Sequence, residues 1–224
     1  MDCDNTWPFR VQTARPVALN SYDHTHPVGT LHDNSLNLDF NRQLTLYLCR
    51  RGLPQSVLDL GCAGGGMVRT LVEAGYQAVG IEGSDLSQKL GRAEWSVIPK
   101  HLFTADATAP FQVESCASAG WVPMRFSAIT AWEFLEHIAE PDLPVLFDNI
   151  HRHLVLGGVL IVSIFTRPDP IWEHYHQTVR SWDWWVRRMG QAGLLYDWDA
   201  TLNFMGAWVR QGPWGYSQNG IFRK

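Results

Sequence analysis

The segment from residue 57 to residue 66, VLDLGCAGGG, constrains the fold of this chain more than any other stretch. It begins with an apolar run of the length of a buried strand and passes into a turn of small residues. Small residues let the backbone approach a ligand closely, and the first turn of a following helix offers free N–H groups. The segment therefore predicts a strand, a tight turn and a helix around a ligand, with Asp59 in reach of a cationic or hydroxylic group.

The same alternation of strand and helix patterns continues along the chain. Strands are predicted at residues 56–60, 78–81, 102–104, 126–131 and 159–165, and helices at 36–49, 67–74, 144–154 and 182–192. Shorter strand-like pieces follow near 195–198, 204–209 and 220–223. Strands that alternate with helices are typical of an α/β fold with a mostly parallel sheet. Residues 1–35 show neither period, so we expect an irregular N-terminal arm or lid before a domain at 36–224.

Composition excludes several classes of protein. A net charge of −4 without a long basic run makes nucleic acid an unexpected partner, although a short RNA end stays open. The chain has no run of 18 apolar residues and no apolar leader at its start, so we expect neither a membrane span nor a signal peptide. Its four cysteines lack zinc-like spacing. We expect them to be reduced thiols in a cytoplasmic protein.

The spacing of the glycines distinguishes a dinucleotide-binding site from a site for another nucleoside cofactor. A dinucleotide site requires GxGxxG, and the chain fails this pattern whether it is started at Gly61 or at Gly64. An oxidoreductase is therefore the last-ranked function. The pattern DxGxxGG, which begins at Asp59, is complete and resembles the loop of class I, Rossmann-like methyltransferases that use S-adenosylmethionine (SAM). The run GIEGSD…RAEW…LFTADAT from residue 80 to residue 108 is similar to a subgroup of small bacterial and viral methyltransferases.

This resemblance implies a fold and a cofactor site. The fold would be a seven-stranded, mainly parallel sheet with helices on both faces and an antiparallel C-terminal edge strand. Glu82, at the end of the second strand, would accept hydrogen bonds from the ribose hydroxyls, and Asp106 would recognise adenine. The alternative is that Asp59, Glu82 and Asp106 are turn residues at strand ends without a ligand-binding role. The complete predicted SAM site comprises Asp59, Gly61, Cys62, Ala63, Gly64, Glu82, Gly83, Asp106, Ala107 and Trp132.

A second cluster follows the fourth strand, at the edge where ligands bind in parallel sheets. If the chain turns helical at once, Glu133, Glu136 and His137 lie on one helical face. Together with His176 they resemble the groups that hold a divalent cation in small-RNA 2′-O-methyltransferases and ubiquinone-pathway O-methyltransferases. Two carboxylates and two imidazoles suit Mg²⁺, Mn²⁺ or Fe²⁺. Two alternatives stay open: Glu133 and His137 act as catalytic acid–base or positioning groups without a metal, or the cluster is ordinary polarity at a helix start.

Tryptophan is concentrated near the end of the chain. Trp182, Trp185, Val186 and Met189 follow helical spacing and predict a core face. Three others, Trp172, Trp208 and Trp214, are expected in loops or edge strands, where an exposed ring stacks on a sugar or a planar ring. Trp95 is a candidate for covering the adenine.

These patterns together predict a SAM-dependent O-methyltransferase. The expected acceptor is a hydroxyl of a small polar molecule, such as a sugar or a hydroxylated metabolite. Two alternatives are an RNA-end 2′-O-methyltransferase, which should show a basic face, and a non-catalytic SAM-fold partner protein, which should have lost part of the loop or of the acidic series.

Overall fold

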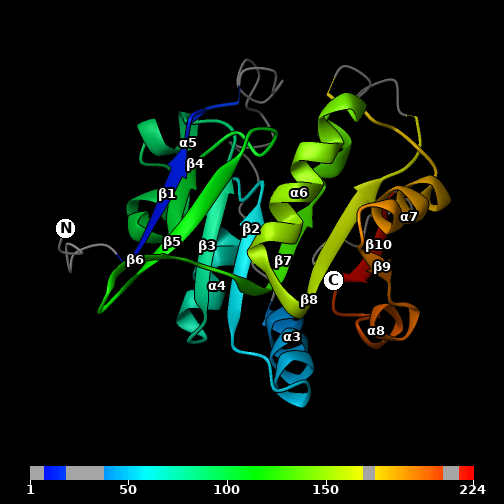
Figure 1. Cartoon of the computed structure of the whole chain (residues 1–224), viewed down its shortest axis with the longest axis horizontal. Helices are drawn as coiled ribbons and strands as arrows, with labels where there is room; N and C mark the ends of the chain where they lie inside the picture. Colours follow the sequence, from blue (N-terminus) through cyan, green and yellow to red (C-terminus); the bar gives the residue numbers. More distant parts are fainter. Residues whose placement is uncertain (1–7, 19–37, 169–174, 209–216) are drawn as a thin grey trace.

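A computed structural model describes residues 8–18, 38–168, 175–208 and 217–224. Its main sheet has seven strands in the order β4-β3-β2-β7-β8-β10-β9 (Figure 1). The pairs from β4 to β8 are parallel, whereas β10 is antiparallel to both β8 and β9. This confirms the predicted fold class. The strands are β2 (Ser56–Leu60), β3 (Gln77–Glu82), β4 (Leu102–Thr104), β7 (Phe126–Trp132), β8 (Leu154–Phe165), β9 (Leu195–Tyr196) and β10 (Ser217–Arg223).

Helices cover both faces of this sheet because alternate residues of each strand point to opposite sides. Leu58 and Leu60 of β2 belong to one apolar core, together with α6 and α7, whereas Val57 belongs to a second core with α3 and α4. The helices are α3 (Leu38–Arg50), α4 (Gly66–Glu73), α5 (Leu86–Lys89), α6 (Leu143–His153), α7 (Trp182–Gln191) and α8 (Trp198–Asn203). Short 3₁₀ segments are η1 (Ala93–Ser96), η2 (Pro99–His101), η3 (Leu135–His137) and η4 (Glu140–Asp142).

A second sheet of three strands corrects two predictions. β1 (Phe9–Thr13) lies within the stretch expected to be an irregular arm, and it pairs antiparallel with β5 (Phe111–Ala117). β6 (Gly120–Pro123) completes this sheet in a region expected to be loop (Figure 1). Phe9, Phe111 and Val113 are buried in the core that contains α6. Both strands alternate apolar and polar residues, FRVQT in β1 and FQVES in β5, a strand signal that sequence analysis missed.

The tail differs from its predicted strands in one place. The strand expected at 204–209 is wrong for the described residues, because α8 occupies the preceding segment and Phe204 is its C-cap. Asp197 starts this helix by accepting a hydrogen bond from the backbone N–H of Ala200 at 3.0 Å, an N-cap that ends the strand-like run at 195–196. Strand β10 confirms the last predicted piece.

The predicted tryptophan face is confirmed at its centre. Trp185 and Met189 are fully buried, and Trp182 and Val186 pack against the same core. Trp208, expected to be exposed, is buried and belongs to the core with α3. Trp172 and Trp214 lie outside the described residues.

The cysteines also differ from expectation. Cys49 and Cys62 are free, but Cys116 on β5 is disulfide-bonded, which corrects the prediction of a reduced thiol there; Cys3 lies outside the described residues. Among the described helices, none combines the length and the apolar character needed to cross a lipid bilayer.

Candidate functional site: the carboxyl end of the sheet with a glycine-rich loop

The loop after β2 adopts backbone conformations that favour small residues. Gly61 and Gly65 have φ angles of 72° and 84°, and the N–H groups of Gly61 and Cys62 both donate to the carbonyl of Ile81, at 2.8 and 3.1 Å. A Cβ atom on Gly61 would lie 2.7 Å from Cδ2 of Phe134. The loop is therefore folded back on β3, and glycine is required where it passes Phe134, the second residue after β7 (Phe126–Trp132).

Ala63 has a φ of 47° although it is not a glycine, and two side chains hold it there. Its N–H donates to Oε2 of Glu82 at 2.8 Å, and its carbonyl accepts a hydrogen bond from Nε1 of Trp95 at 2.8 Å. Trp95, a candidate for covering adenine, is thus buried with its indole N–H committed to the loop. The tryptophan was noticed in the sequence, but its contact depends on η1 and could not be inferred from spacing.

Asp59 lies in β2 directly before this loop and is buried. Oγ1 of Thr130, its register partner on β7, donates to Oδ1 of Asp59 at 2.6 Å. Burial raises the pKa of the Asp59 carboxyl to about 7, with a smaller contribution from the charge of Glu82 and an opposing one from the Thr130 hydrogen bond. A cationic ligand group beside Asp59 would favour its charged form. Thr130 is a site residue that sequence analysis missed, because only strand pairing reveals it.

Glu82 and Asp106 lie at the carboxyl ends of β3 and β4, the two strands next to β2 on this side of the sheet. Glu82 ends β3 and pairs in register with Thr104 of β4, two residues before Asp106, so both acids lie at the same sheet edge as Asp59. Oε1 of Glu82 accepts a hydrogen bond from the Ser84 N–H at 3.1 Å. Oδ1 of Asp106 accepts two hydrogen bonds from Thr108, from N at 2.8 Å and from Oγ1 at 2.6 Å.

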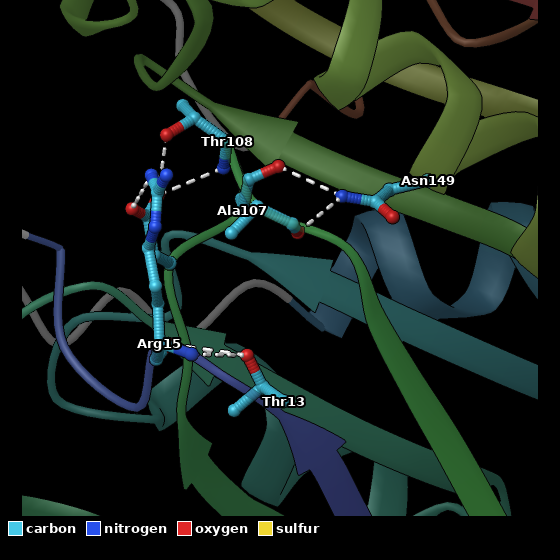
Figure 2. A network of polar contacts seen from close by, with 7 residues as sticks. Thr13, Arg15, Ala107, Thr108 and Asn149 are labelled. Atoms are coloured by element: carbon cyan, nitrogen blue, oxygen red, sulfur yellow. Dashed lines mark hydrogen bonds and ion pairs between the residues drawn. The ribbon is translucent and has the colours of Figure 1, made fainter.

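The backbone after Asp106 is anchored from α6. Nδ2 of Asn149 donates to the carbonyls of Ala107 and Ala109, at 3.0 and 2.8 Å (Figure 2). This fixes the loop that carries the predicted adenine-recognising carboxylate. The structure thus brings the predicted cofactor residues of three strands to one edge.

The end of β7 presents Trp132 and Glu133 at this edge. Trp132 is buried against Phe40 of α3, with ring centroids 4.9 Å apart, and its Nε1 has no hydrogen-bond partner within the described residues. Glu133 has a φ of 48°, and its N–H donates to Oγ of Ser163 at 3.0 Å. Its Oε2 accepts a hydrogen bond from Oγ of Ser217 at 2.9 Å, whereas its Oε1 is buried without a partner among the described residues.

The conformation of Glu133 corrects the expected helical face. Glu133 turns the chain in the left-handed region, and only the short 3₁₀ segment η3 follows it, so Glu133 does not lie on one α-helical face with Glu136 and His137. The physical reason is that β7 ends on Ser163 of β8, which fixes the direction of the backbone before any helix begins.

Three of the four predicted metal ligands do converge. One ligand atom each from Glu136, His137 and His176 lies within 4.8 Å of the others. Glu136 is fully buried, Oε1 accepts from the Phe165 N–H at 3.0 Å, and Oε2 has no partner among the described residues. Burial, and then the nearby charge of Glu133, raises the pKa of Glu136 well above its ordinary value.

The segment that carries His176 is tied to η3 by backbone contacts. Thr178 donates through its N–H to the Glu136 carbonyl at 2.9 Å and through Oγ1 to the Ile138 carbonyl at 2.6 Å. Nδ1 of His137 lies 3.1 Å from the carbonyl oxygen of Tyr175, and the His137 and His176 rings are 5.0 Å apart. Both imidazoles are therefore held beside the Glu136 carboxyl.

Comparisons with known proteins agree with this architecture. A family model described as "Methyltransferase domain" matches residues 35–200. A Burkholderia thailandensis 1,6-didemethyltoxoflavin-N1-methyltransferase with bound S-adenosylhomocysteine has a similar fold, with a TM-score of 0.58, 12% identity, and coverage of 90% of this chain and 84% of that one. A Synechocystis magnesium protoporphyrin IX methyltransferase with the same bound nucleoside gives a TM-score of 0.53 at 15% identity, covering 92% and 96% of the two chains.

The fold and the strand-end site define a class I, Rossmann-like SAM-dependent methyltransferase architecture. The chain belongs to the methyltransferase domain family. Among its relatives, a protein of Methylococcus capsulatus named ubiquinone biosynthesis O-methyltransferase is 32% identical over 75% of this chain and 65% of its own length. A protein of an Azoarcus species with the same name is 31% identical over 63% of this chain and 56% of its own length. The chain thus spans less than two thirds of each of these relatives.

Proposed function

We propose that this protein transfers a methyl group from SAM to a hydroxyl of a small acceptor. The observation that carries the proposal is one end of the sheet at which carboxylates lie at or next to the ends of β2, β3 and β4, together with the cluster formed by Glu136, His137 and His176. The relatives named O-methyltransferases support oxygen as the atom that receives the methyl group.

The residues at this edge fit the cofactor. The loop at Gly61 is held close against Phe134, and the buried Nε1 of Trp132 has no partner among the described residues, so a ligand group can satisfy it. In our proposal, Asp59 meets the amino group of the cofactor, Glu82 the ribose hydroxyls and Asp106 the adenine. When bound, SAM supplies an electrophilic methyl group, and the protein aligns the acceptor and excludes water.

We also propose that Glu136, His137 and His176 hold a divalent cation, with Mg²⁺, Mn²⁺ or Fe²⁺ as candidates. The donor set fits, because with Nδ1 of His137 at the Tyr175 carbonyl its Nε2 is available as a ligand, and Oε2 of Glu136 has no partner among the described residues. A cation there would lower the pKa of the acceptor hydroxyl. Such an ion would also offset the cost of burying the Glu136 carboxylate.

Glu133 has a different proposed role. Its Oε2 accepts a hydrogen bond from Ser217 of β10, and its carboxyl lies beside that of Glu136, whose pKa it raises. In our proposal the Glu133 carboxylate accepts the proton of an acceptor hydroxyl. His137 is the alternative base if no metal binds. Glu133 lies outside the group of three ligand atoms, which favours acid–base work over metal ligation for this residue.

The acceptor is proposed to be a hydroxylated metabolite rather than a sugar. The two relatives are named for ubiquinone biosynthesis. The sugar hypothesis relied on exposed tryptophans, and Trp208 is buried. A phenolic hydroxyl beside a cation and a carboxylate ionises more readily than a sugar hydroxyl, so the site chemistry also favours the former.

The test has a binding arm and a turnover arm. Isothermal titration with S-adenosylhomocysteine (SAH), with and without Mg²⁺ or Mn²⁺, should show binding, and the absence of heat would remove the cofactor proposal. SAH release should then be measured with a dihydroxybenzoate, a methyl glycoside and an RNA oligonucleotide. We expect turnover with the phenol only; turnover of the RNA alone would favour the RNA-end alternative, and turnover of none would favour a non-catalytic role.

The metal proposal has its own matched pair of variants. Glu136→Gln should abolish metal-stimulated turnover, whereas Glu140→Gln should not, because Glu140 lies in the next short segment and forms an exposed ion pair with Arg180. Metal binding is read independently by titrating Mn²⁺ and following its electron paramagnetic resonance signal. Full activity of the wild-type protein in EDTA, or equal Mn²⁺ binding by both variants, would defeat the metal assignment.

A further inference from the structure

The stretch that follows β1 crosses the loops after β3 and β4. The carbonyl of Arg15 accepts a hydrogen bond from the Asp106 N–H at 2.9 Å, and the Ala18 N–H donates to the Gly83 carbonyl at 2.9 Å. The Cβ of Ala18 lies 3.1 Å from the point that a Cβ on Gly83 would occupy. We call residues 14–18 the strap. It joins the two loops in which the ribose-binding and adenine-binding residues are proposed.

The side chain of Arg15 reaches the Asp106 carboxylate as well. Nη1 of Arg15 lies 3.4 Å from Oδ2 of Asp106, whose side chain is 5% exposed while that of Arg15 is 49% exposed. Oγ1 of Thr13 accepts a hydrogen bond from the Arg15 N–H at 3.0 Å, which fixes the backbone at the start of the strap (Figure 2). The two carboxylate oxygens of Asp106 therefore have different partners. Oδ1 accepts two hydrogen bonds from Thr108, and Oδ2 accepts one from Nη1 of Arg15.

This arrangement of contacts on Asp106 would distinguish between purines that carry different groups at the position facing Oδ2. Adenine presents an exocyclic amino group, which donates hydrogen bonds, whereas hypoxanthine presents a carbonyl, which only accepts them. With Oδ1 filled by Thr108, Oδ2 is the oxygen with spare acceptor capacity, and its direction depends on the group that holds it. A carboxylate free to rotate would lose part of this directional preference.

We propose that Arg15 is a positioning residue that aims Oδ2 of Asp106 at the amino group of adenine, and that the strap is part of the nucleoside site. The proposal rests on the proposed function, since it assumes that Asp106 reads the adenine. The strap follows the antiparallel pairing of β1 with β5, in which Thr13 lies opposite Phe111, so its position is set by the second sheet.

The predicted effect is one of discrimination between ligands. Arg15→Ala should weaken SAH binding about fivefold, the size expected for losing one partly exposed charged contact. Binding of S-inosylhomocysteine, in which a carbonyl replaces the amino group, should change less than twofold. Arg15→Lys should restore part of the discrimination, because an ammonium group also attracts Oδ2 but lacks the planar geometry of the guanidinium.

Arg10→Ala is the matched control. Arg10 lies on β1, the strand that leads into the strap, and forms an ion pair with Glu114 on β5, away from Asp106. Removing it should affect stability without changing the ratio of the two dissociation constants. Thermal melting of each variant separates loss of fold from loss of recognition.

The experiment is isothermal titration of the full-length wild type and variants with both nucleosides. A reduced SAH preference in Arg15→Ala, retained in Arg10→Ala, supports the proposal. Equal losses for both nucleosides, or an unchanged ratio, would overturn the role of Arg15 while leaving the cofactor assignment intact. If Asp106→Asn keeps the wild-type ratio, adenine recognition by Asp106 fails and the role of Arg15 with it. If the wild type binds neither nucleoside, the proposed function itself fails.

Discussion

Acid should destabilise this protein through His153, a fully buried side chain at the end of α6. Its Nε2 accepts a hydrogen bond from the Val113 N–H at 3.1 Å, and its Nδ1 lies 2.8 Å from the Asn149 carbonyl oxygen. The ring stacks on Phe111 at 4.6 Å. A proton on Nε2 would face the Val113 N–H, so the folded state requires the neutral ring.

The size of the effect follows from the pKa. Burial, opposed by the Asn149 hydrogen bond, lowers the pKa of His153 from 6.5 to about 4. Between these values the unfolded chain binds a proton that the folded chain does not, so the free energy of unfolding falls as the pH is lowered. From pH 7.5 to pH 4.5 this linkage amounts to about 2.5 kcal/mol, lost mainly below pH 6.5.

Urea denaturation at pH 7.5, 6.0 and 4.5 measures this loss by comparison with His153→Gln, which cannot titrate. Because other groups titrate in both proteins, only the difference between the two stability profiles reports on His153. His151→Gln is the comparison variant: His151 is exposed two residues earlier on α6, and partial burial and Lys224 lower its pKa in the same direction, so its removal should flatten the profile less than the removal of His153. Parallel profiles for the wild type and His153→Gln would refute the reasoning.

Three further predictions concern the cofactor site. Burial raises the pKa of Asp59 to about 7, so the fraction of charged carboxylate falls about tenfold from pH 8 to pH 6. If the cationic amino group of SAH binds this carboxylate, SAH affinity in calorimetric titrations should fall about tenfold over the same range. Asp59→Asn should remove that pH dependence. Gly61→Ala should weaken SAH binding at least about tenfold, because its Cβ would lie 2.7 Å from Phe134. Gly75→Ala is the control: Gly75 has a φ of 88° but open space around it, so the substitution should lower only the melting temperature. Trp95→Phe keeps the ring but removes the N–H that donates to the loop carbonyl, so SAH affinity should drop about fivefold by titration; unchanged affinity would count against a rigid loop.

The main sheet could be predicted because each of its central strands is a continuous apolar run next to a turn signal. β2 and β4 have the predicted bounds, and β7 extends one residue further than expected. The small sheet could not be predicted in the same way. β1 and β5 are separated by about a hundred residues of chain. Their alternation could have indicated two strands, but no local pattern records that they pair with each other and pack on α6.

The candidate site shows the same division. Carboxylates at the ends of parallel strands meet by topology, so the positions of Glu82 and Asp106 followed from the order of the strands. The side chains that hold them did not, because the contacts of Arg15 and Trp95 depend on segments that cross the edge from elsewhere. Glu133 differs most from expectation, since its left-handed backbone arises from the hydrogen bond with Ser163 on a neighbouring strand.

The place of β10 in the sheet affects how the molecule is completed during synthesis. A ribosome presents β9 before β10, yet β10 lies between β8 and β9, so β9 cannot join the sheet until β10 has paired with β8. Until β10 pairs, the side of β8 that faces away from β7 is an open sheet edge, and the Glu133 carboxylate has no hydrogen bond from Ser217. The pairing of β10 with β8 and the contact of Ser217 with Glu133 therefore form together, after β8 and before β9 joins the sheet.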